Sequence, residues 1–81
     1  MVSKTDREKA WAKAPKVRGK NPDLYRRDAK GNELYKHSYG KQGPKSWEID
    51  HKKPKAKGGS NHQRNLQILQ TKANRKKSDK Y

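Results

Sequence analysis

Cysteine and phenylalanine are absent from this 81-residue chain, and valine, isoleucine and leucine together number only eight. Without cysteine the chain can form neither disulfide bonds nor a zinc site with thiolate ligands. No apolar run approaches the roughly 20 residues that span a bilayer, and no apolar stretch of the signal-peptide kind follows Met1. We therefore expect a soluble protein of the cytoplasm that has no membrane partner.

Apolar residues of every kind are scarce for a folded domain. They make up 26% of the chain, whereas charged residues make up 38%, a balance close to that of chains too polar to fold. A domain of this size buries only about 60% of the surface that its unfolded chain exposes. The length allows one domain at most, and disorder is the first alternative to a fold.

Acidic residues are also few, because 8 Asp and Glu face 23 Lys and Arg, which leaves a formal net charge of +15. Both halves of the chain share this excess, so it does not belong to one detachable tail. Such a field favours a polyanion, above all nucleic acid, because each neutralised phosphate releases condensed counterions. An anionic membrane surface would require an amphipathic helix with large apolar residues on one face, and no segment supplies one.

The N-terminal stretch is basic and poorly patterned. Thr5 and Glu8 have the spacing of a capping box, which predicts a short helix within residues 1–14. Proline and glycine then interrupt the chain repeatedly. We expect residues 1–20 to be a basic segment, the part of the chain most prone to flexibility, and residues 21–81 to form the domain.

Several short elements are predicted downstream. Residues 24–35 have the pattern of a β-hairpin, and residues 47–51 alternate apolar and acidic side chains as a half-buried strand does. A long polar loop, a second strand over residues 65–70 and a helix capped by Thr71 and ending near Asp79 follow. The expected core is small and consists of Trp47, Ile49, Leu66, Ile68, Leu69, Leu34 and Tyr35.

Four side chains in the second half could act on a phosphodiester: Asp50, His51, Asn65 and Asn74. Each has an ordinary structural alternative, namely a capping carboxylate, a surface imidazole, a turn-forming asparagine and a surface helix residue. Their placement favours the functional interpretation. The first two end the predicted strand, the third lies where the loop ends, and the fourth lies on the following helix.

These four belong to a longer run that reads Glu48-Ile49-Asp50-His51, Pro54, Lys57-Gly58-Gly59-Ser60, Asn65-Leu66-Gln67-Ile68-Leu69 and Asn74-Arg75-Lys76-Lys77-Ser78-Asp79. The run occupies residues 47–79 and resembles the HNH endonuclease motif. The stretch before it, with Pro22-Asp23-Leu24-Tyr25-Arg26-Arg27-Asp28, Gly31-Asn32 and Tyr39-Gly40-Lys41, is similar to small single-domain members, which are often phage-associated. The resemblance thus implies a bacterial or phage-encoded protein.

The resemblance implies an α+β fold, the ββα-metal finger, in which two antiparallel strands and a helix hold one divalent ion. An N-terminal helix and hairpin would extend this unit. Asp50 would be a metal ligand, His51 the general base, Asn65 the residue that ties the loop so that the base is oriented, and Asn74 the second ligand.

The sequence departs from the family pattern at two places. Asn74 stands where the last histidine of the motif usually lies, which makes this the H-N-N variant. Gln70 and Ala73 stand where many relatives carry zinc-binding cysteines, so no structural zinc is expected. A carboxylate and an amide oxygen are hard ligands that suit Mg²⁺ or Mn²⁺ better than Zn²⁺, and a histidine can accept the proton of an attacking water near neutral pH.

The basic residues around the motif are expected to contact phosphates along DNA without reading the bases, although any one of them could be an ordinary solvated side chain. They are Lys52, Lys53, Lys55, Lys57, Arg64, Arg75, Lys76 and Lys77.

The leading hypothesis is a metal-dependent DNA endonuclease that nicks or cuts duplex DNA with low intrinsic sequence specificity. A partner protein could supply the target specificity. One alternative is a nucleic-acid-binding module that keeps the scaffold without activity, which the neutral side chain of Asn74 favours. Another alternative, which follows from composition alone, is a mostly disordered basic segment that binds RNA or a membrane.

Overall fold

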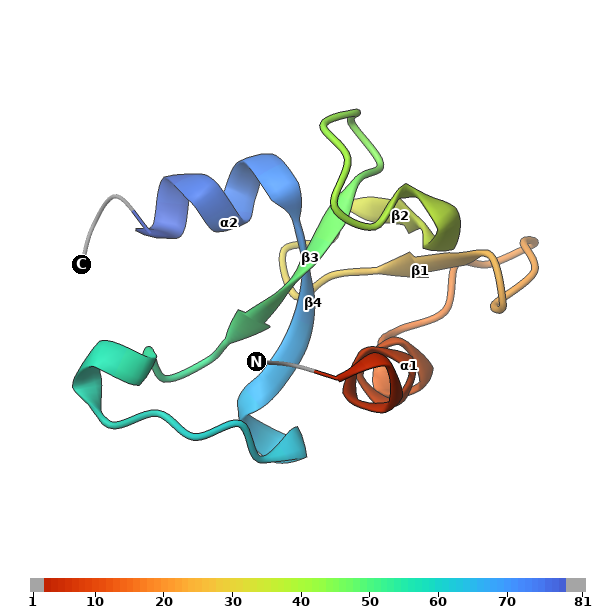
Figure 1. The fold of residues 1–81 in the computed structure, drawn as a ribbon. Coiled ribbons are helices and arrows are strands. Elements are labelled where there is room, and N and C mark those ends of the chain that lie inside the picture. The colour runs from red at the N-terminus through yellow and green to blue at the C-terminus, as the bar shows by residue number, and fades with distance from the viewer. Residues whose placement is uncertain (1–2, 79–81) are drawn as a thin grey trace.

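A computed structural model describes residues 3–78 of the chain, and its elements are shown in Figure 1. In chain order they are α1 (Lys4–Lys13), β1 (Tyr25–Arg27), β2 (Glu33–Tyr35), β3 (Trp47–His51), β4 (Leu66–Gln70) and α2 (Thr71–Ser78). Three short 3-10 turns span Lys36–Ser38, Lys55–Lys57 and Gln63–Asn65. The strands form two antiparallel pairs, β1 with β2 and β3 with β4. The predicted α+β class is confirmed.

Strands β3 and β4 and helix α2 form the predicted ββα unit. Asp50 lies opposite Gln67 in the antiparallel register, and His51 lies opposite Leu66. Helix α2 follows β4 without a break and contacts both strands. In Figure 1 α1 and α2 lie on opposite sides of the β3–β4 hairpin. One face of the hairpin therefore packs against α1, and the other face packs against α2, the helix that carries Asn74.

The start of α2 corrects one prediction. Thr71 is the first residue of the helix rather than the residue before it, and its buried hydroxyl has no hydrogen-bond partner within the described part of the chain. The cap is wrong because β4 runs directly into the helix. The backbone N–H of Gln70 instead donates to Oδ2 of Asp28 at 2.9 Å. The predicted helix end, Asp79, lies outside the described residues.

The predicted β-hairpin in the first half is present, and Asp28 connects it to the ββα unit. The buried carboxylate of Asp28 accepts hydrogen bonds from the backbone N–H groups of Lys30 and Asn32 inside the turn. It also accepts from the side chain of Asn32 and from the backbone of Gln70. With four donors this buried charge is well satisfied, and it fixes the turn against the junction of β4 and α2.

Helix α1 forms within the predicted range but with a different cap. Ser3 Oγ accepts from the backbone N–H of Asp6, and Asp6 Oδ2 accepts from the backbone N–H of Ser3, so the capping box is Ser3 to Asp6. The predicted pair of Thr5 and Glu8 is wrong because both residues lie inside the helix. At the other end the buried guanidinium of Arg26 donates to carbonyl oxygens of the helix terminus, which ties α1 to β1.

The core is built around two tryptophans from different halves of the chain. The rings of Trp11 on α1 and Trp47 on β3 lie 5.0 Å apart between centroids, and both side chains are 3% exposed. Ala10, Leu34 and Ile68 complete the cluster, whereas Ile49 is only partly buried against it. Helix α1 thus docks on the core through Trp11, whereas Tyr35 of the expected core is only partly buried. Among residues 3–78 neither helix is long and apolar enough to cross a membrane.

Candidate active site

Asp50 lies near the end of β3 with its side chain turned toward α2. It is 5% exposed. Its Oδ2 atom accepts hydrogen bonds from Gln67 Nε2 at 2.7 Å and from Lys77 Nζ at 2.7 Å. Two donors, one of them charged, thus stabilise a carboxylate that burial would otherwise destabilise.

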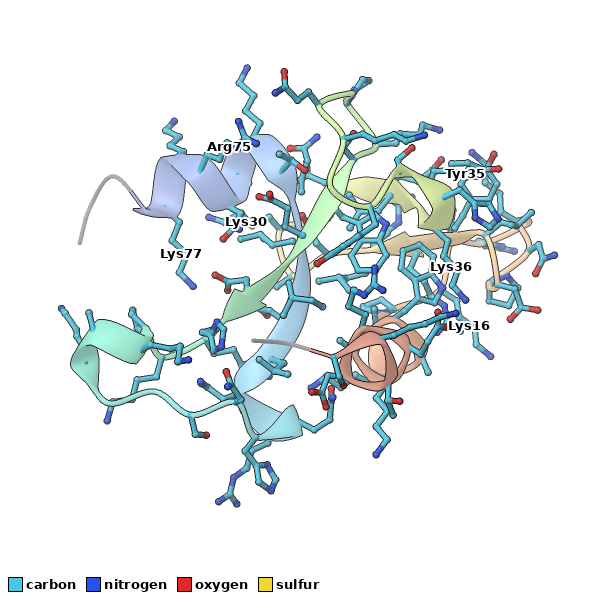
Figure 2. All side chains as sticks on the ribbon, viewed as in Figure 1. Lys16, Lys30, Tyr35, Lys36, Arg75 and Lys77 are labelled. Carbon is cyan, nitrogen blue, oxygen red and sulfur yellow. The ribbon has the colours of Figure 1, made fainter. Side chains whose placement is uncertain are left out.

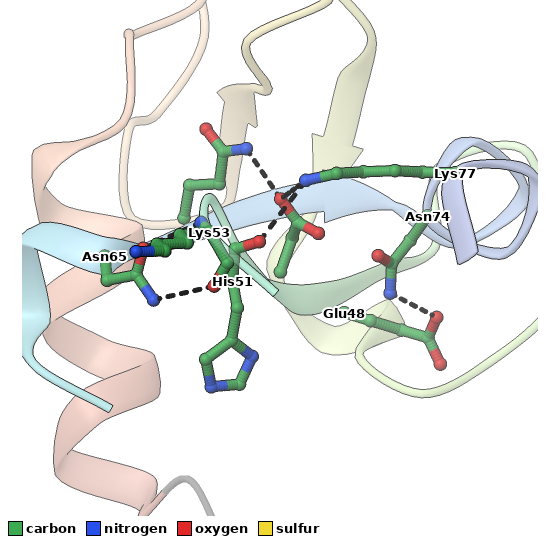
Figure 3. A network of polar contacts seen from close by, with 8 residues as sticks. Glu48, His51, Lys53, Asn65, Asn74 and Lys77 are labelled. Carbon is green, nitrogen blue, oxygen red and sulfur yellow. Dashed lines mark hydrogen bonds and ion pairs between the residues drawn. The ribbon is translucent and has the colours of Figure 1, made fainter. Parts of the chain in front are cut away.

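Asn74 and Lys77 lie one helical turn apart and share one face of α2. Both reach from α2 toward β3 in Figure 3. Asn74 Nδ2 donates to Glu48 Oε1 at 3.2 Å. Strand alternation places Glu48 on the same face as Asp50. Two carboxylates and an amide therefore lie between the strand and the helix.

His51 ends β3 and lies beside the loop of residues 52–64. Its Nε2 atom lies 2.7 Å from the side-chain oxygen of Asn61. An amide oxygen can only accept a hydrogen bond, so Nε2 carries the proton and Nδ1 keeps its lone pair. The half-exposed imidazole can therefore accept a second proton at Nδ1 from a water or substrate group.

Asn65 joins the two ends of that loop. Its side-chain oxygen accepts from the backbone N–H of Lys53 at 2.8 Å, and its amide nitrogen donates to the carbonyl oxygens of Lys53 and Ser60. Its backbone carbonyl also accepts from the N–H of Lys52 at 2.8 Å. Hydrogen bonds with Asn65 thus hold the backbone of Lys52 and Lys53, the two residues that follow His51.

The Gly58-Gly59 pair permits a close approach of the loop to itself. Gly58 adopts a φ of 87°, which glycine tolerates without strain. The N–H of Gly59 donates to the carbonyl of Pro54 at 2.9 Å. A Cβ atom at position 59 would lie 1.8 Å from the carbonyl oxygen of Lys53. Only glycine fits at this crossing.

The predicted phosphate-binding residues fall into two environments. Lys77 is half-buried on Asp50 and also donates to the carbonyl oxygen of His51 at 3.3 Å. Figure 2 shows Lys77 and Arg75 leaving α2 on opposite sides, Lys77 toward the end of β3. The exposed members of the set are Lys52, Lys53, Lys55, Lys57, Arg64, Arg75 and Lys76.

The side chains around Asp50 offer oxygen ligands for a metal ion. Among residues 3–78 no group of three or more His, Cys, Asp or Glu side chains could hold a metal ion. Asp50, Asn74 and Glu48 instead offer carboxylate and amide oxygens, which leave most of a coordination sphere to water and phosphate. The ammonium of Lys77 forms an ion pair with Asp50 at 2.7 Å.

Sequence reasoning missed two residues that the fold brings to the site. Gln67 could have been found from the hairpin register, because it is the cross-strand neighbour of Asp50. No pattern singled out Asn61, because a loop residue is placed on an imidazole only by the course of the whole loop.

Two antiparallel strands followed directly by a helix, with a buried carboxylate near the end of the first strand, are consistent with the ββα-metal fold. The family model described as HNH endonuclease matches residues 36–80, more than half of the chain, and the protein belongs to this family. Searches of curated proteins and of solved structures found no match. Membership supports a nuclease-type function, that of a hydrolase acting on nucleic acids.

Proposed function

We propose that the protein is a metal-dependent DNA endonuclease that hydrolyses phosphodiester bonds of duplex DNA with low intrinsic sequence specificity. The observation that carries the proposal is the arrangement at the end of β3, where Lys77 of α2 donates to the side chain of Asp50 and to the backbone carbonyl oxygen of His51. The net charge of +15 supports a nucleic-acid substrate.

His51 is the general base in this proposal. The contact with Asn61 keeps the proton on Nε2, so Nδ1 can take the proton of the attacking water. Asn65 holds the backbone beyond His51 and thereby orients the imidazole. The products would carry 5′-phosphate ends, as in the family that the sequence resembles.

Asp50 and Asn74 would hold one divalent ion, Mg²⁺ or Mn²⁺, with Glu48 within reach of the same site. When bound, such an ion supplies Lewis-acid stabilisation of the charge that develops on the phosphate and the leaving oxygen. The exposed lysines and arginines of the loop and of α2 position the DNA backbone. We further propose that the protein acts inside a bacterial or phage-infected cell, with a partner protein as one source of target specificity.

Incubation of supercoiled plasmid with the purified protein and Mg²⁺ or Mn²⁺ tests the proposal. We expect relaxed or linear product that EDTA prevents and that His51→Ala reduces by about 100-fold or more. His37→Ala, which removes an exposed imidazole outside the ββα unit, should cut like the wild type. DNA binding without any cutting would instead support the non-catalytic binding module.

A further inference from the structure

A cavity of about 260 Å³ lies between α1, the turn of the β1–β2 hairpin and strand β4. Small apolar side chains form part of its wall, among them Ala10, Ala14 and Ile68. Three cationic side chains also line it, namely Lys13, Arg27 and Lys52. We call this space the α1 cavity. Lys52 and Ile68 belong to the HNH motif, whereas the other residues named here precede it.

The cations of the α1 cavity lack acidic partners. Among residues 3–78 none of the three forms an ion pair with a carboxylate. Within the described part of the chain, the side chains of Lys13 and Arg27 donate to the backbone carbonyls of Gln63 and Gly31. Burial, and then the nearby charge of Lys52, lowers the pKa of Lys13. Cationic side chains that line one cavity without acidic partners favour the approach of an anion.

The one carboxylate at the α1 cavity does not compete for these cations. Asp28 is 3% exposed and already accepts four hydrogen bonds from the hairpin turn and from Gln70. The Asp28 carboxylate is thus already hydrogen-bonded within the fold. The lining therefore combines apolar and cationic residues, which matches a ligand that joins a ring to a phosphate.

The size of the cavity limits the ligand. Pockets for drug-sized molecules begin at about 300 Å³, so a cavity of about 260 Å³ suits a single nucleotide unit. We propose that the α1 cavity binds one nucleotide of the nucleic-acid strand, with its phosphate on Lys13, Arg27 and Lys52 and its sugar or base against Ala10 and Ala14. The choice of a strand rather than a free nucleotide rests on the proposed function.

The α1 cavity adjoins the candidate active site. Lys52 directly follows His51 in the chain, and Gln67, which also lines the cavity, donates to Asp50. A strand that crosses the active site can therefore place a neighbouring nucleotide in the cavity. Helix α1, outside the matched region of residues 36–80, would thus become part of the substrate-binding surface.

The test is an amide NMR titration in EDTA with a deoxynucleoside monophosphate, inorganic phosphate and a short single-stranded oligonucleotide. We expect the nucleotide to shift amides of α1 and Lys52, phosphate to bind more weakly, and the oligonucleotide to displace the nucleotide. Lys13→Gln with Arg27→Gln should weaken nucleotide binding about tenfold. Lys9→Gln with Lys41→Gln, which removes two exposed charges elsewhere, should leave it unchanged. If the double variant unfolds, the two single substitutions carry the comparison.

Equal affinity in the two double variants would overturn the α1 cavity as a binding site. Phosphate binding as tightly as the nucleotide would overturn the nucleotide assignment, and an oligonucleotide that fails to displace the nucleotide would overturn the strand as its source. These results are independent of catalysis. If the protein cuts plasmid but substitution of Lys13 and Arg27 does not change nucleotide binding, only the cavity proposal is rejected. If the protein binds the nucleotide but cuts no plasmid, only the proposed nuclease activity is rejected.

Discussion

The ammonium group of Lys77 lies 2.7 Å from Oδ2 of Asp50, a carboxylate that is 5% exposed. Helix α2 thus delivers a positive charge to the residue that would hold the metal ion. A buried carboxylate with no counter-charge is costly, so Lys77 neutralises Asp50 when no cation is bound. The side chain of Lys77 is 23% exposed, which leaves it a path toward solvent.

Replacement of Lys77 should therefore separate the stability of the metal-free protein from its response to metal. Without divalent ions, Lys77→Met should lower the free energy of unfolding by about 2 kcal/mol, because Asp50 loses a charged hydrogen bond. Added Mg²⁺ should raise the melting temperature more in this variant than in the wild type, since no ammonium competes for Asp50. Thermal unfolding measures both effects. Lys76→Met, which removes an exposed charge from the same helix, should behave as the wild type does.

Asn61 should affect the rate more than substrate binding. Asn61→Leu removes the acceptor that keeps the proton on Nε2 of His51, so kcat should fall about tenfold, or about 1.4 kcal/mol, with little change in KM. Asn61→Asp keeps an acceptor oxygen and should retain most of the activity. Plasmid-nicking kinetics measure the two constants, and a loss confined to KM would show that Asn61 serves binding instead.

Gly59 should tolerate no side chain. In Gly59→Ala the new Cβ meets the carbonyl oxygen of Lys53 at 1.8 Å, so the loop that follows His51 must open. We expect activity to be lost and trypsin to cut faster at the lysines of the loop than it does in the wild type. Gly43→Ala is the matched control, because its Cβ would make an ordinary contact with Ser46 at 3.5 Å. Similar digestion of the two variants would contradict the close crossing.

Trp11 should be essential for the fold although it precedes the HNH motif. Trp11→Ala removes a side chain that is 3% exposed and packs on Trp47, and large-to-small changes of this kind cost about 3–5 kcal/mol. Urea unfolding gives the value, and Lys9→Ala on the exposed face of α1 provides the control. A stability unaffected by Trp11→Ala would support the expectation that residues 1–20 are a flexible segment.

The contribution of Glu33 to stability should disappear in acid. Hydrogen bonds from Lys20 and then Lys45 lower the pKa of Glu33 from its ordinary value of 4.5 to about 2. A carboxylate with a lowered pKa stabilises the folded state above its unfolded pKa, and this stability is lost as the pH falls through the folded pKa. Glu33→Gln should melt slightly below the wild type at neutral pH, because surface pairs contribute little. The difference should vanish as the pH falls from 4.5 to about 2.

Melting curves across this pH range test the contribution of Glu33. Asp23→Asn removes an exposed acid that forms no ion pair with any described residue, so its melting difference from the wild type should not follow the same course. A constant difference in melting temperature between Glu33→Gln and the wild type at every pH would contradict the prediction. It would show that the ion pairs of Glu33 with the two lysines do not stabilise the fold.

Local patterns were sufficient for the ββα unit. Alternating residues predicted β3, and the dense apolar patch predicted β4. The order strand, loop, strand, helix also follows from spacing along the chain, because each element depends on neighbours a few residues away. The predicted helix caps were wrong because a local spacing rule can fit more than one residue near a helix start. Thr5 with Glu8 and Ser3 with Asp6 have equal spacing, and the helix that begins at Lys4 uses the second pair.

The sequence by itself determined the family, the fold class and the sign of the field around the site, because the motif, the periodicity and the charge are properties of the chain alone. Only the tertiary structure decided that Trp11 completes the core, that Lys77 lies on Asp50 and that Asn61 holds His51. These pairs are separated by 10 to 36 positions in the chain. Their contacts arise when α1, the loop and α2 close on one β-hairpin, a geometry that no local pattern encodes.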